Sequence, residues 1–322
     1  MTYSAAWETL AGVEIAVLRD TEAEAEVRVA PALGNTCVGF RLGDWRVLDE
    51  PPNETELREH AGSYGIPVLF PWPNRVRDAR FTFEGREYRL PPAADEPNAI
   101  HGLVRDRPWQ PTRCEADAEA ALVRSEIRSP DFPELADQYP SAFELSLTYA
   151  LRRGRLEIEA FGTNVGDGPL PFGFGLHPYF PVPLGPGGRR ESCELRVPAA
   201  EVWELGDYLP SGRRFAADGR YDLRDFRALD RETYDDVLTA LEQPFRAALR
   251  DPVAGREIVV EADAGFREFV LFAPSRRSIV ALEPYTCATD ALNLEPRGID
   301  AGLRALQPGQ SWQGRVTIEP RS

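Results

Sequence analysis

Residues 143–161 read FELSLTYALRRGRLEIEAF and contain two runs in which apolar and polar side chains alternate. The first run covers Phe143 to Leu151 and the second covers Arg155 to Phe161. Alternation with a period of two is typical of β-strands that have one buried face and one solvated face. This stretch therefore predicts β-strands in the middle of the chain.

The same alternation recurs on both sides of this stretch, in the ranges Val13 to Leu18, Glu24 to Val29, Phe81 to Leu90, Glu257 to Glu261, Glu268 to Phe272 and Arg315 to Ile318. Turn-forming clusters separate the runs, and the totals of 29 Pro and 26 Gly fit a chain with many reversals. Helical spacing occurs only in Glu54 to His60 and Thr233 to Leu241, and neither segment resembles the crossover helix of a parallel sheet. The pattern predicts an all-β, mostly antiparallel fold and disfavours a doubly wound α/β fold.

The length of 322 residues is compatible with one or two domains. The sequence has no repeat of 20 to 50 residues, no low-complexity linker and no break in composition. We therefore expect a single β domain over residues 1–322. The charged segment Glu115 to Arg128 is predicted to be a solvated edge strand.

Composition and charge limit the possible partners. Hydrophobic residues make up 43% and charged residues 28% of the chain, which is typical of a soluble globular protein. The 37 basic and 52 acidic residues give a net charge of −15, which would repel nucleic acid and anionic membrane surfaces. The first 20 residues contain neither a basic cluster nor an apolar stretch of roughly 18 residues. We expect a cytoplasmic protein that binds neither nucleic acid nor membranes.

Motifs for several common chemistries are missing from the sequence. It has no GxGxxG or GxxxxGK[ST] motif for nucleotides and no GxSxG nucleophile elbow. The four cysteines are far apart, which favours buried free thiols. The three histidines lack the spacing of zinc ligands, and His60 lies in a charged segment typical of a surface position. We expect no metal and no cofactor.

Four segments carry candidate chemistry. His101 precedes Gly102 after a loop, and His177 lies between Gly175 and Pro178 among aromatic residues, where apolar surroundings tune the pKa of an imidazole. Glu283 follows an apolar run, so partial desolvation would raise its pKa toward that of a general base.

The fourth segment, residues 65–75, ends in Trp72-Pro73-Asn74-Arg75, and Trp and Arg at a loop rim are suited to holding a sugar. The alternative is a Trp72 that belongs to the core and an Arg75 that pairs with a carboxylate.

Together these clusters resemble the aldose 1-epimerase (mutarotase) family of the galactose mutarotase-like superfamily. The resemblance follows a definite order along residues 65 to 310. It comprises Asn74-Arg75, Phe81 to Gly85 with Tyr88 to Leu90, Asn98 to Gly102, Trp109, Asn164 to Pro171 with His177-Pro178-Tyr179, Tyr234-Asp235, Glu283-Pro284 with Asp290 to Asn293, and Leu306 to Gly309.

The resemblance implies a large antiparallel β-sandwich and the interconversion of the α and β anomers of a hexose or related sugar. It implies Glu283 as general base and His177 as general acid. It also implies His101, Arg75 and Asp235 as ligands of the sugar, in a monomer or homodimer without metal or cofactor. Each positioned proton transfer is worth about 10²–10⁴ in rate, so an acid and a base on opposite sides of the sugar would suffice.

Departures from the family pattern leave alternatives open. Asp236 stands where many members have His, so either Asp235 or Asp236 could contact substrate, and a second Leu-Glu-Pro places Glu295 in competition with Glu283. Three other functions remain possible. A sugar-phosphate epimerase would need an arginine cluster, with candidates Arg77, Arg80, Arg105 and Arg107. A glycoside hydrolase would use Glu283 together with Asp235. A sugar sensor would bind the sugar without catalysis.

Overall fold

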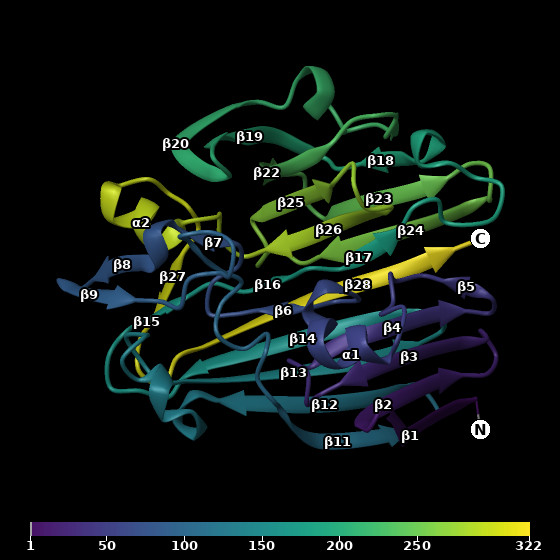
Figure 1. Ribbon diagram of the computed structural model, residues 1–322, viewed down its shortest axis with the longest axis horizontal. Coiled ribbons are helices and arrows are strands. Elements are labelled where there is room, and N and C mark those ends of the chain that lie inside the picture. The colour runs from purple at the N-terminus through teal and green to yellow at the C-terminus, as the bar shows by residue number, and fades with distance from the viewer. Residues whose placement is uncertain (1) are drawn as a thin grey trace.

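The computed structural model describes residues 2–322, and strands dominate its regular structure (Figure 1). The paired strands run antiparallel, and the one parallel contact in this part of the chain is an isolated bridge between Phe70 and Gly102. The expected all-β antiparallel class is confirmed. Within the same residues, no helix is both long and apolar enough to cross a membrane.

The largest sheet has nine strands and contains the stretch that predicted the fold. Its order is β11 (Gln110–Ala116), β12 (Ala121–Arg128), β13 (Phe143–Arg152), β14 (Arg155–Asn164), β28 (Ser311–Arg321), β24 (Arg256–Ala262), β23 (Phe245–Asp251), β18 (Glu194–Arg196) and β21 (Arg227–Ala228). Strands β13 and β14 form a hairpin closed at Arg153-Gly154, where both residues have positive φ. Glycine adopts this conformation without steric cost, so the turn fits the sequence.

A five-stranded sheet from the N-terminal part of the chain packs on one end of the nine-stranded sheet. It consists of β1 (Tyr3–Leu10), β2 (Val13–Asp20), β3 (Ala25–Ala30), β4 (Thr36–Leu42) and β5 (Trp45–Arg46). Strand β2 contacts both β12 and β13. Helix α1 (Glu54–His60) covers the other face of this sheet, where Leu57 packs with Val17 and Val38.

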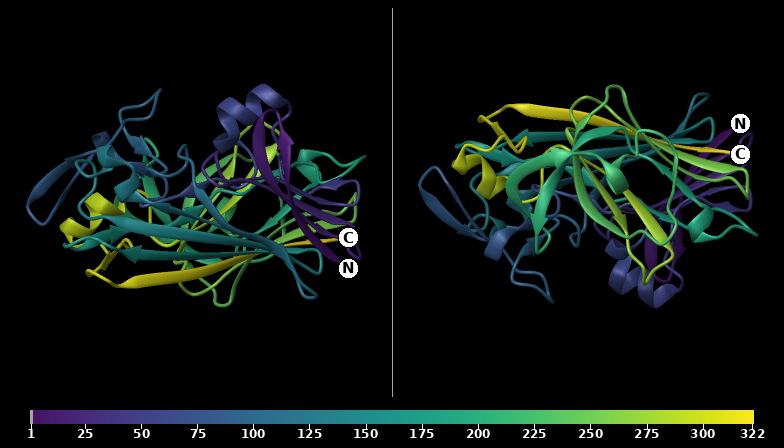
Figure 2. Two further views of the ribbon diagram at one scale, coloured as in Figure 1. Left: turned by 90° about the horizontal axis from the view of Figure 1, so that it is seen from below. Right: turned by 90° about the horizontal axis from the view of Figure 1, so that it is seen from above.

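The third sheet has eight strands and carries the candidate site. Its order is β20 (Leu209–Ala216), β19 (Ala199–Gly206), β22 (Tyr234–Leu241), β25 (Glu268–Ala273), β26 (Ile279–Tyr285), β16 (Gly175–Leu176) and β6 (Val68–Leu69), with β17 (Tyr179–Pro181) beside β26. The turned views of Figure 2 show the long sheets as stacked layers. Side chains between the layers form the main core, in which the rings of Phe245 and Phe269 lie 4.8 Å apart.

Short elements connect these sheets. They are the pairs β7 (Arg75–Val76) with β10 (Ala99–Ile100), β8 (Arg80–Phe83) with β9 (Arg86–Arg89) and β15 (Leu170–Phe172) with β27 (Arg304–Leu306), helix α2 (Ala291–Leu294), and 3₁₀ turns at Ala61–Ser63, Arg77–Ala79, Ser129–Asp131, Pro133–Leu135, Arg190–Ser192, Gly219–Tyr221 and Glu295–Arg297. One core cluster includes residues from Tyr3 to Ile318. The single-domain organisation over residues 1–322 stays a prediction.

Two expectations about secondary structure are wrong. The segment Thr233 to Leu241 is not helical but contains strand β22, which pairs with β19 and β25. The strand is buried on both faces, so apolar and polar residues do not alternate along it as they do in a half-solvated strand. The segment Glu115 to Arg128 is not an edge strand, because β11 forms the edge and β12 lies inside it with alternate residues buried.

The predictions for helix Glu54 to His60 and for an exposed His60 are confirmed. All four cysteines are free, and three of them are buried, but Cys114 is only partly buried. The described residues contain no cluster of three or more His, Cys, Asp or Glu side chains arranged to hold a metal ion.

Candidate functional site

The candidate site lies on the face of the eight-stranded sheet that points away from the main core. Along β26, Val280 and Leu282 point into that core, so alternation turns Ala281 and Glu283 to the opposite face. Register places Val270 of β25 beside Glu283. We call this face the site face.

Glu283 is buried in the middle of the site face, with 1% of its surface exposed. The Tyr285 hydroxyl, two residues along the same strand, donates a hydrogen bond to its Oε2. Its Oε1 has no hydrogen-bond partner. An unpaired acceptor in a buried position is costly, so this oxygen is available to a bound ligand.

His177 lies between β16 and β17 and reaches the same place from the neighbouring strands. Its backbone N–H donates to the Pro67 carbonyl at 3.2 Å. Nearby, a side chain at Gly175 would stand 2.5 Å from the Tyr285 ring, so only glycine lets β16 approach β26 this closely. The Gly-x-His segment therefore sets the distance between the histidine and the glutamate.

The imidazole and the carboxylate are in contact. His177 Nε2 lies 3.2 Å from Glu283 Oε1. The geometry is not that of a hydrogen bond, since Oε1 stays unpaired, and Nε2 instead interacts with the Tyr179 hydroxyl at 3.2 Å. The expectation of an acid and a base on opposite sides of a sugar does not fit, because a gap of 3.2 Å cannot contain a pyranose ring.

Burial controls the pKa values of this pair. Desolvation raises the pKa of Glu283 well above its ordinary value, while the Tyr285 hydrogen bond opposes that rise. Desolvation also lowers the pKa of His177 to about 3, and the charges of Arg105 and Arg277 act in the same direction. Burial of both groups therefore favours the uncharged pair, with its proton on Glu283.

His101 completes a histidine pair at the same site. Its ring centre lies 5.3 Å from that of His177, in an edge-to-face arrangement, and its Nδ1 has no hydrogen-bond partner. The residue has φ of +64°, and its N–H bonds to the Asn74 carbonyl. Burial lowers the pKa of His101 well below its ordinary value, and the nearby His177 adds to the effect. The ring is therefore a neutral donor or acceptor.

Asp235 and Asp236 occupy opposite faces of β22. Register places Asp235 beside Phe272 on the site face, and its carboxylate forms no hydrogen bond or ion pair within residues 2–322. Burial raises the pKa of Asp235, while the charge of Arg75 opposes that rise. Asp236 instead accepts hydrogen bonds from Arg220 at 2.8 Å and Tyr221 at 3.0 Å.

Arg75 on β7 lies near this group, since its charge acts on the pKa of both Glu283 and Asp235. Its Nε donates to both oxygens of Glu96, at 3.0 and 2.9 Å, and its guanidinium stands 4.9 Å from the Tyr208 ring. The alternative of a carboxylate partner for Arg75 is therefore correct, although its Nη2 makes no hydrogen bond within the described residues.

Trp72 does not lie at a loop rim. It is 2% exposed and stacks on Tyr139 with ring centres 5.8 Å apart, so the interpretation as a sugar platform is wrong. Its indole belongs to the core that supports the loop.

The second Leu-Glu-Pro has a structural task. Glu295 Oε1 accepts hydrogen bonds from the N–H groups of Ala301 and Leu303, at 2.9 and 3.2 Å. The Asp-Ala-Leu-Asn segment after Glu283 is structural too, because the Asp290 N–H donates to the Arg75 carbonyl at 2.8 Å. The loop after β26 thereby holds β7, and with it Arg75, against the site.

The four arginines that a phosphate site would need are each paired with a different carboxylate. The pairs are Arg77 with Asp290, Arg80 with Asp78, Arg105 with Asp106 and Arg107 with Glu134. Among them, only Arg105 influences the pKa of His177. None of the four therefore stands without a carboxylate partner.

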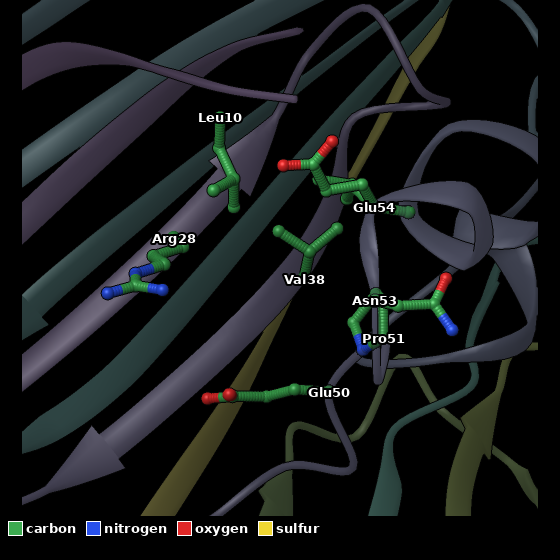
Figure 3. Close-up of a pocket in the computed structure, with 8 residues that line it drawn as sticks. Leu10, Arg28, Val38, Glu50, Pro51, Asn53 and Glu54 are labelled. Atoms are coloured by element: carbon green, nitrogen blue, oxygen red, sulfur yellow. The ribbon is translucent and has the colours of Figure 1, made fainter. Parts of the chain in front are cut away.

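A separate small hollow of about 190 Å³ lies between α1 and the five-stranded sheet. Figure 3 shows Val38 at its centre, with Leu10, Arg28 and Glu50 around it. Glu50 in this hollow forms an ion pair with Arg41. None of the predicted site residues lines this hollow, so it is not the candidate site.

Sequence reasoning missed the roles of Tyr285 and Tyr208. Tyr285 was predictable in principle, because two residues on one strand share a face. Tyr208 was not, because it belongs to the β19–β20 hairpin and meets Arg75 only through the tertiary fold.

Comparison with known proteins agrees with this picture. The family model described as aldose 1-epimerase matches residues 31–319. The uncharacterized protein YphB of Escherichia coli is 33% identical over 270 residues, which cover 78% of this chain and 81% of that protein. The uncharacterized protein YihR of the same organism is 24% identical over 82% of this chain and 80% of that protein.

Solved structures show the same fold. A galactose mutarotase-like protein from Clostridium acetobutylicum superposes with a TM-score of 0.89 at 21% identity, covering 99% of this chain and 98% of that one. Galactose 1-epimerase from Lactobacillus acidophilus superposes with a TM-score of 0.79 at 19% identity, with the same coverage. The expected galactose mutarotase-like sandwich is therefore confirmed, and since the family model extends over nearly the whole sequence, the chain belongs to the aldose 1-epimerase family.

Proposed function

We propose that this protein is an aldose 1-epimerase that interconverts the anomers of a neutral hexose or a close derivative. Glu283 acts as general base and His177 as general acid, and His101, Arg75 and Asp235 bind sugar hydroxyls. The observation that carries the proposal is the buried contact of 3.2 Å between His177 Nε2 and Glu283 Oε1.

The contact suits a reaction centred on one carbon atom. The hydroxyl oxygen O1 and the ring oxygen O5 of an aldopyranose are both bonded to C1, so an acid and a base that touch each other can reach both from one side. Glu283 takes the proton of the C1 hydroxyl while His177 gives a proton to O5. The C1–O5 bond then breaks and an open-chain aldehyde forms.

The reverse transfers complete the reaction. Rotation about C1–C2 presents the other face of the aldehyde, the O5 hydroxyl returns its proton to His177 as it attacks C1, and Glu283 returns its proton to O1. The pair carries the same number of protons before and after ring opening, because one proton leaves His177 and one arrives on Glu283. No proton from solvent is needed.

The electrostatics of the site support this exchange. Ring opening converts the ion pair of carboxylate and imidazolium into the uncharged pair, which burial favours. Two groups raise the share of the ion pair before opening. The Tyr285 hydroxyl and the Arg75 charge both lower the pKa of Glu283. The pair therefore titrates as a unit with two macroscopic pKa values.

The remaining residues position the sugar. His101 offers an unpaired Nδ1, Asp235 an unpaired carboxylate and Arg75 an Nη2 that is not used by Glu96. A neutral aldose presents hydroxyl groups that match these donors and acceptors. The cytoplasmic location and the monomeric or dimeric state stay predictions.

The test uses polarimetry of a freshly dissolved single anomer. Replacement Glu283→Gln removes the base and keeps the shape, so it should lower kcat by about 10²–10⁴ and retain sugar binding. Glu295→Gln, in the second Leu-Glu-Pro, is the matched control and should mutarotate at the wild-type rate.

Turnover near the wild-type rate in Glu283→Gln would reject the assignment of the base. Release of reducing ends from an aryl glycoside by the wild type would indicate a hydrolase instead. Sugar binding without any acceleration of anomer exchange by the wild type would indicate a sensor.

A further inference from the structure

A cleft of about 610 Å³ opens beside the proposed catalytic pair. It lies between the β19–β20 hairpin tip, the start of β22 and the loop after β25. Glu283 and His177 do not line it, but Asp235 and Phe272 do. The Phe272 ring stands 6.2 Å from the His177 ring, so Phe272 adjoins both the cleft and the catalytic pair.

Tyr208 forms part of the rim of this cleft and is unusual for its position. Asp207 and Tyr208 make up the two-residue turn between β19 and β20, and both have positive φ, of 49° and 64°. Such turns strongly prefer Asn-Gly or Asp-Gly, because a bulky side chain is strained in the left-handed region. Local folding therefore does not explain a tyrosine here.

The Tyr208 side chain is also unusual in its exposure. It is 55% exposed, although it contacts the Arg75 guanidinium at 4.9 Å. An exposed aromatic ring on a strained backbone, at the edge of a cleft, is typical of a ligand contact. Arg75 itself does not depend on the ring for its position, because Glu96 holds it with two hydrogen bonds.

The polar groups of the cleft complement this ring. Asp235 has an unpaired carboxylate at its inner end, and the exposed Arg276 in the loop after β25 forms no ion pair or hydrogen bond within residues 2–322. A flat aromatic face combined with a carboxylate and a planar guanidinium fork matches a sugar ring, which has C–H faces and hydroxyl edges.

The orientation of the reacting sugar decides what enters the cleft. In the proposed function, C1 with its two oxygens meets Glu283 and His177, so the far side of the ring points toward Asp235 and the cleft. A second sugar linked at that far side leaves C1 free to react. A sugar linked through C1 has no anomeric hydroxyl and cannot react.

We propose that this cleft is a subsite for a second sugar ring, and that the substrate class is reducing disaccharides or longer oligosaccharides whose reducing end is epimerised. This inference rests on the proposed function. Tyr208 stacks on the second ring, and Arg276 binds its hydroxyls.

The experiment compares kcat/KM by polarimetry for D-glucose and for maltose, cellobiose and lactose, which all present glucose at the reducing end. The variant Tyr208→Gly removes the ring and suits the φ of +64°, so the hairpin should still fold. It should lower kcat/KM for the preferred disaccharide by about 3- to 10-fold and leave that for D-glucose unchanged.

Two controls accompany it. Tyr208→Phe keeps the ring and should keep the disaccharide rate. Arg153→Gly makes the same kind of change at the β13–β14 turn, where φ is +51°, and should change neither rate.

Three results would overturn the inference, and they are distinguishable. Equal losses on both classes of sugar in Tyr208→Gly, or a wild type that turns over D-glucose but none of the disaccharides, would reject the subsite and leave the proposed function standing. A wild type that accelerates neither class would reject both.

Discussion

The Tyr285 hydroxyl provides a sharp test of the electrostatics of the pair. It donates a hydrogen bond to Glu283 Oε2 and lowers the pKa of that carboxyl, against the rise caused by burial. The variant Tyr285→Phe removes the hydroxyl and leaves the ring in place. The pKa of Glu283 should therefore rise further, and less of the pair should be in the ionised form that opens the sugar.

The magnitude follows from the cost of one charge-assisted hydrogen bond. A hydrogen bond to a charged group contributes about 1.5–3 kcal/mol, and one pKa unit corresponds to about 1.4 kcal/mol. Because burial favours the form with the single proton on Glu283, loss of the bond should shift the alkaline limb of the kcat/KM profile upward by about 1–2 pH units. The share of the ion pair, and with it kcat/KM between the two limbs, should fall by about 10- to 100-fold.

The assay is polarimetric kcat/KM over the range of pH in which the protein stays folded. Activity in the wild type should fall at low pH, where both members of the pair are protonated, and at high pH, where neither is. Tyr149→Phe is the control, because its buried hydroxyl bonds to the Asn35 carbonyl at 2.8 Å and not to the pair. A Tyr285→Phe profile that superposes on the wild type would refute the reasoning.

Two further predictions concern carboxylates. Asp235→Ala should lower kcat/KM for a monosaccharide by about 10- to 100-fold through loss of a hydrogen bond to the sugar. Asp236→Ala should leave KM unchanged and reduce the free energy of unfolding by about 1–3 kcal/mol, because it breaks the contacts to Arg220 and Tyr221. The reverse pattern in steady-state kinetics and urea unfolding would exchange the roles of the two aspartates. Burial raises the pKa of Glu268 to about 7, so the folded state holds a proton that the unfolded state releases, and stability should fall as pH rises from about 4.5 to 7 by up to about 3 kcal/mol. Glu268→Gln keeps an acceptor for the Trp203 N–H and should remove this decline in stability, as measured by urea unfolding at both pH values. A decline in the variant equal to that of the wild type would show that Glu268 is not its cause.

The sequence predicts the fold best where one face of a strand is solvated. Strand β14 alternates in burial along its whole length, and the runs in Phe143 to Leu151 and Arg155 to Phe161 lie within β13 and β14. Strand β22 was misassigned because it is central in its sheet, with Val237 and Leu238 both buried on opposite faces. Burial on both faces removes the alternation that identifies a strand.

The site was predictable where chemistry and local sequence coincide. Glu283 and His177 were found through an apolar strand and a constrained Gly-x-His segment, and the structure brings them into contact. Their distance was not predictable, because it depends on the approach of β16 to β26 over Gly175. The carboxylate partner of Arg75 was not predictable either, because Glu96 lies in a loop that comes close to Arg75 only through the pairing of β7 with β10.

A double-mutant cycle on the catalytic pair tests the central claim most directly, with the anomer exchange rate at equilibrium measured by saturation-transfer NMR. If Glu283 and His177 exchange protons as one unit, Glu283→Gln and His177→Gln should each lower the enzymatic rate by about 10²–10⁴, and the double variant should be no slower than the slower single variant. Losses that multiply in the double variant, or a single variant that retains the wild-type rate, would contradict the account.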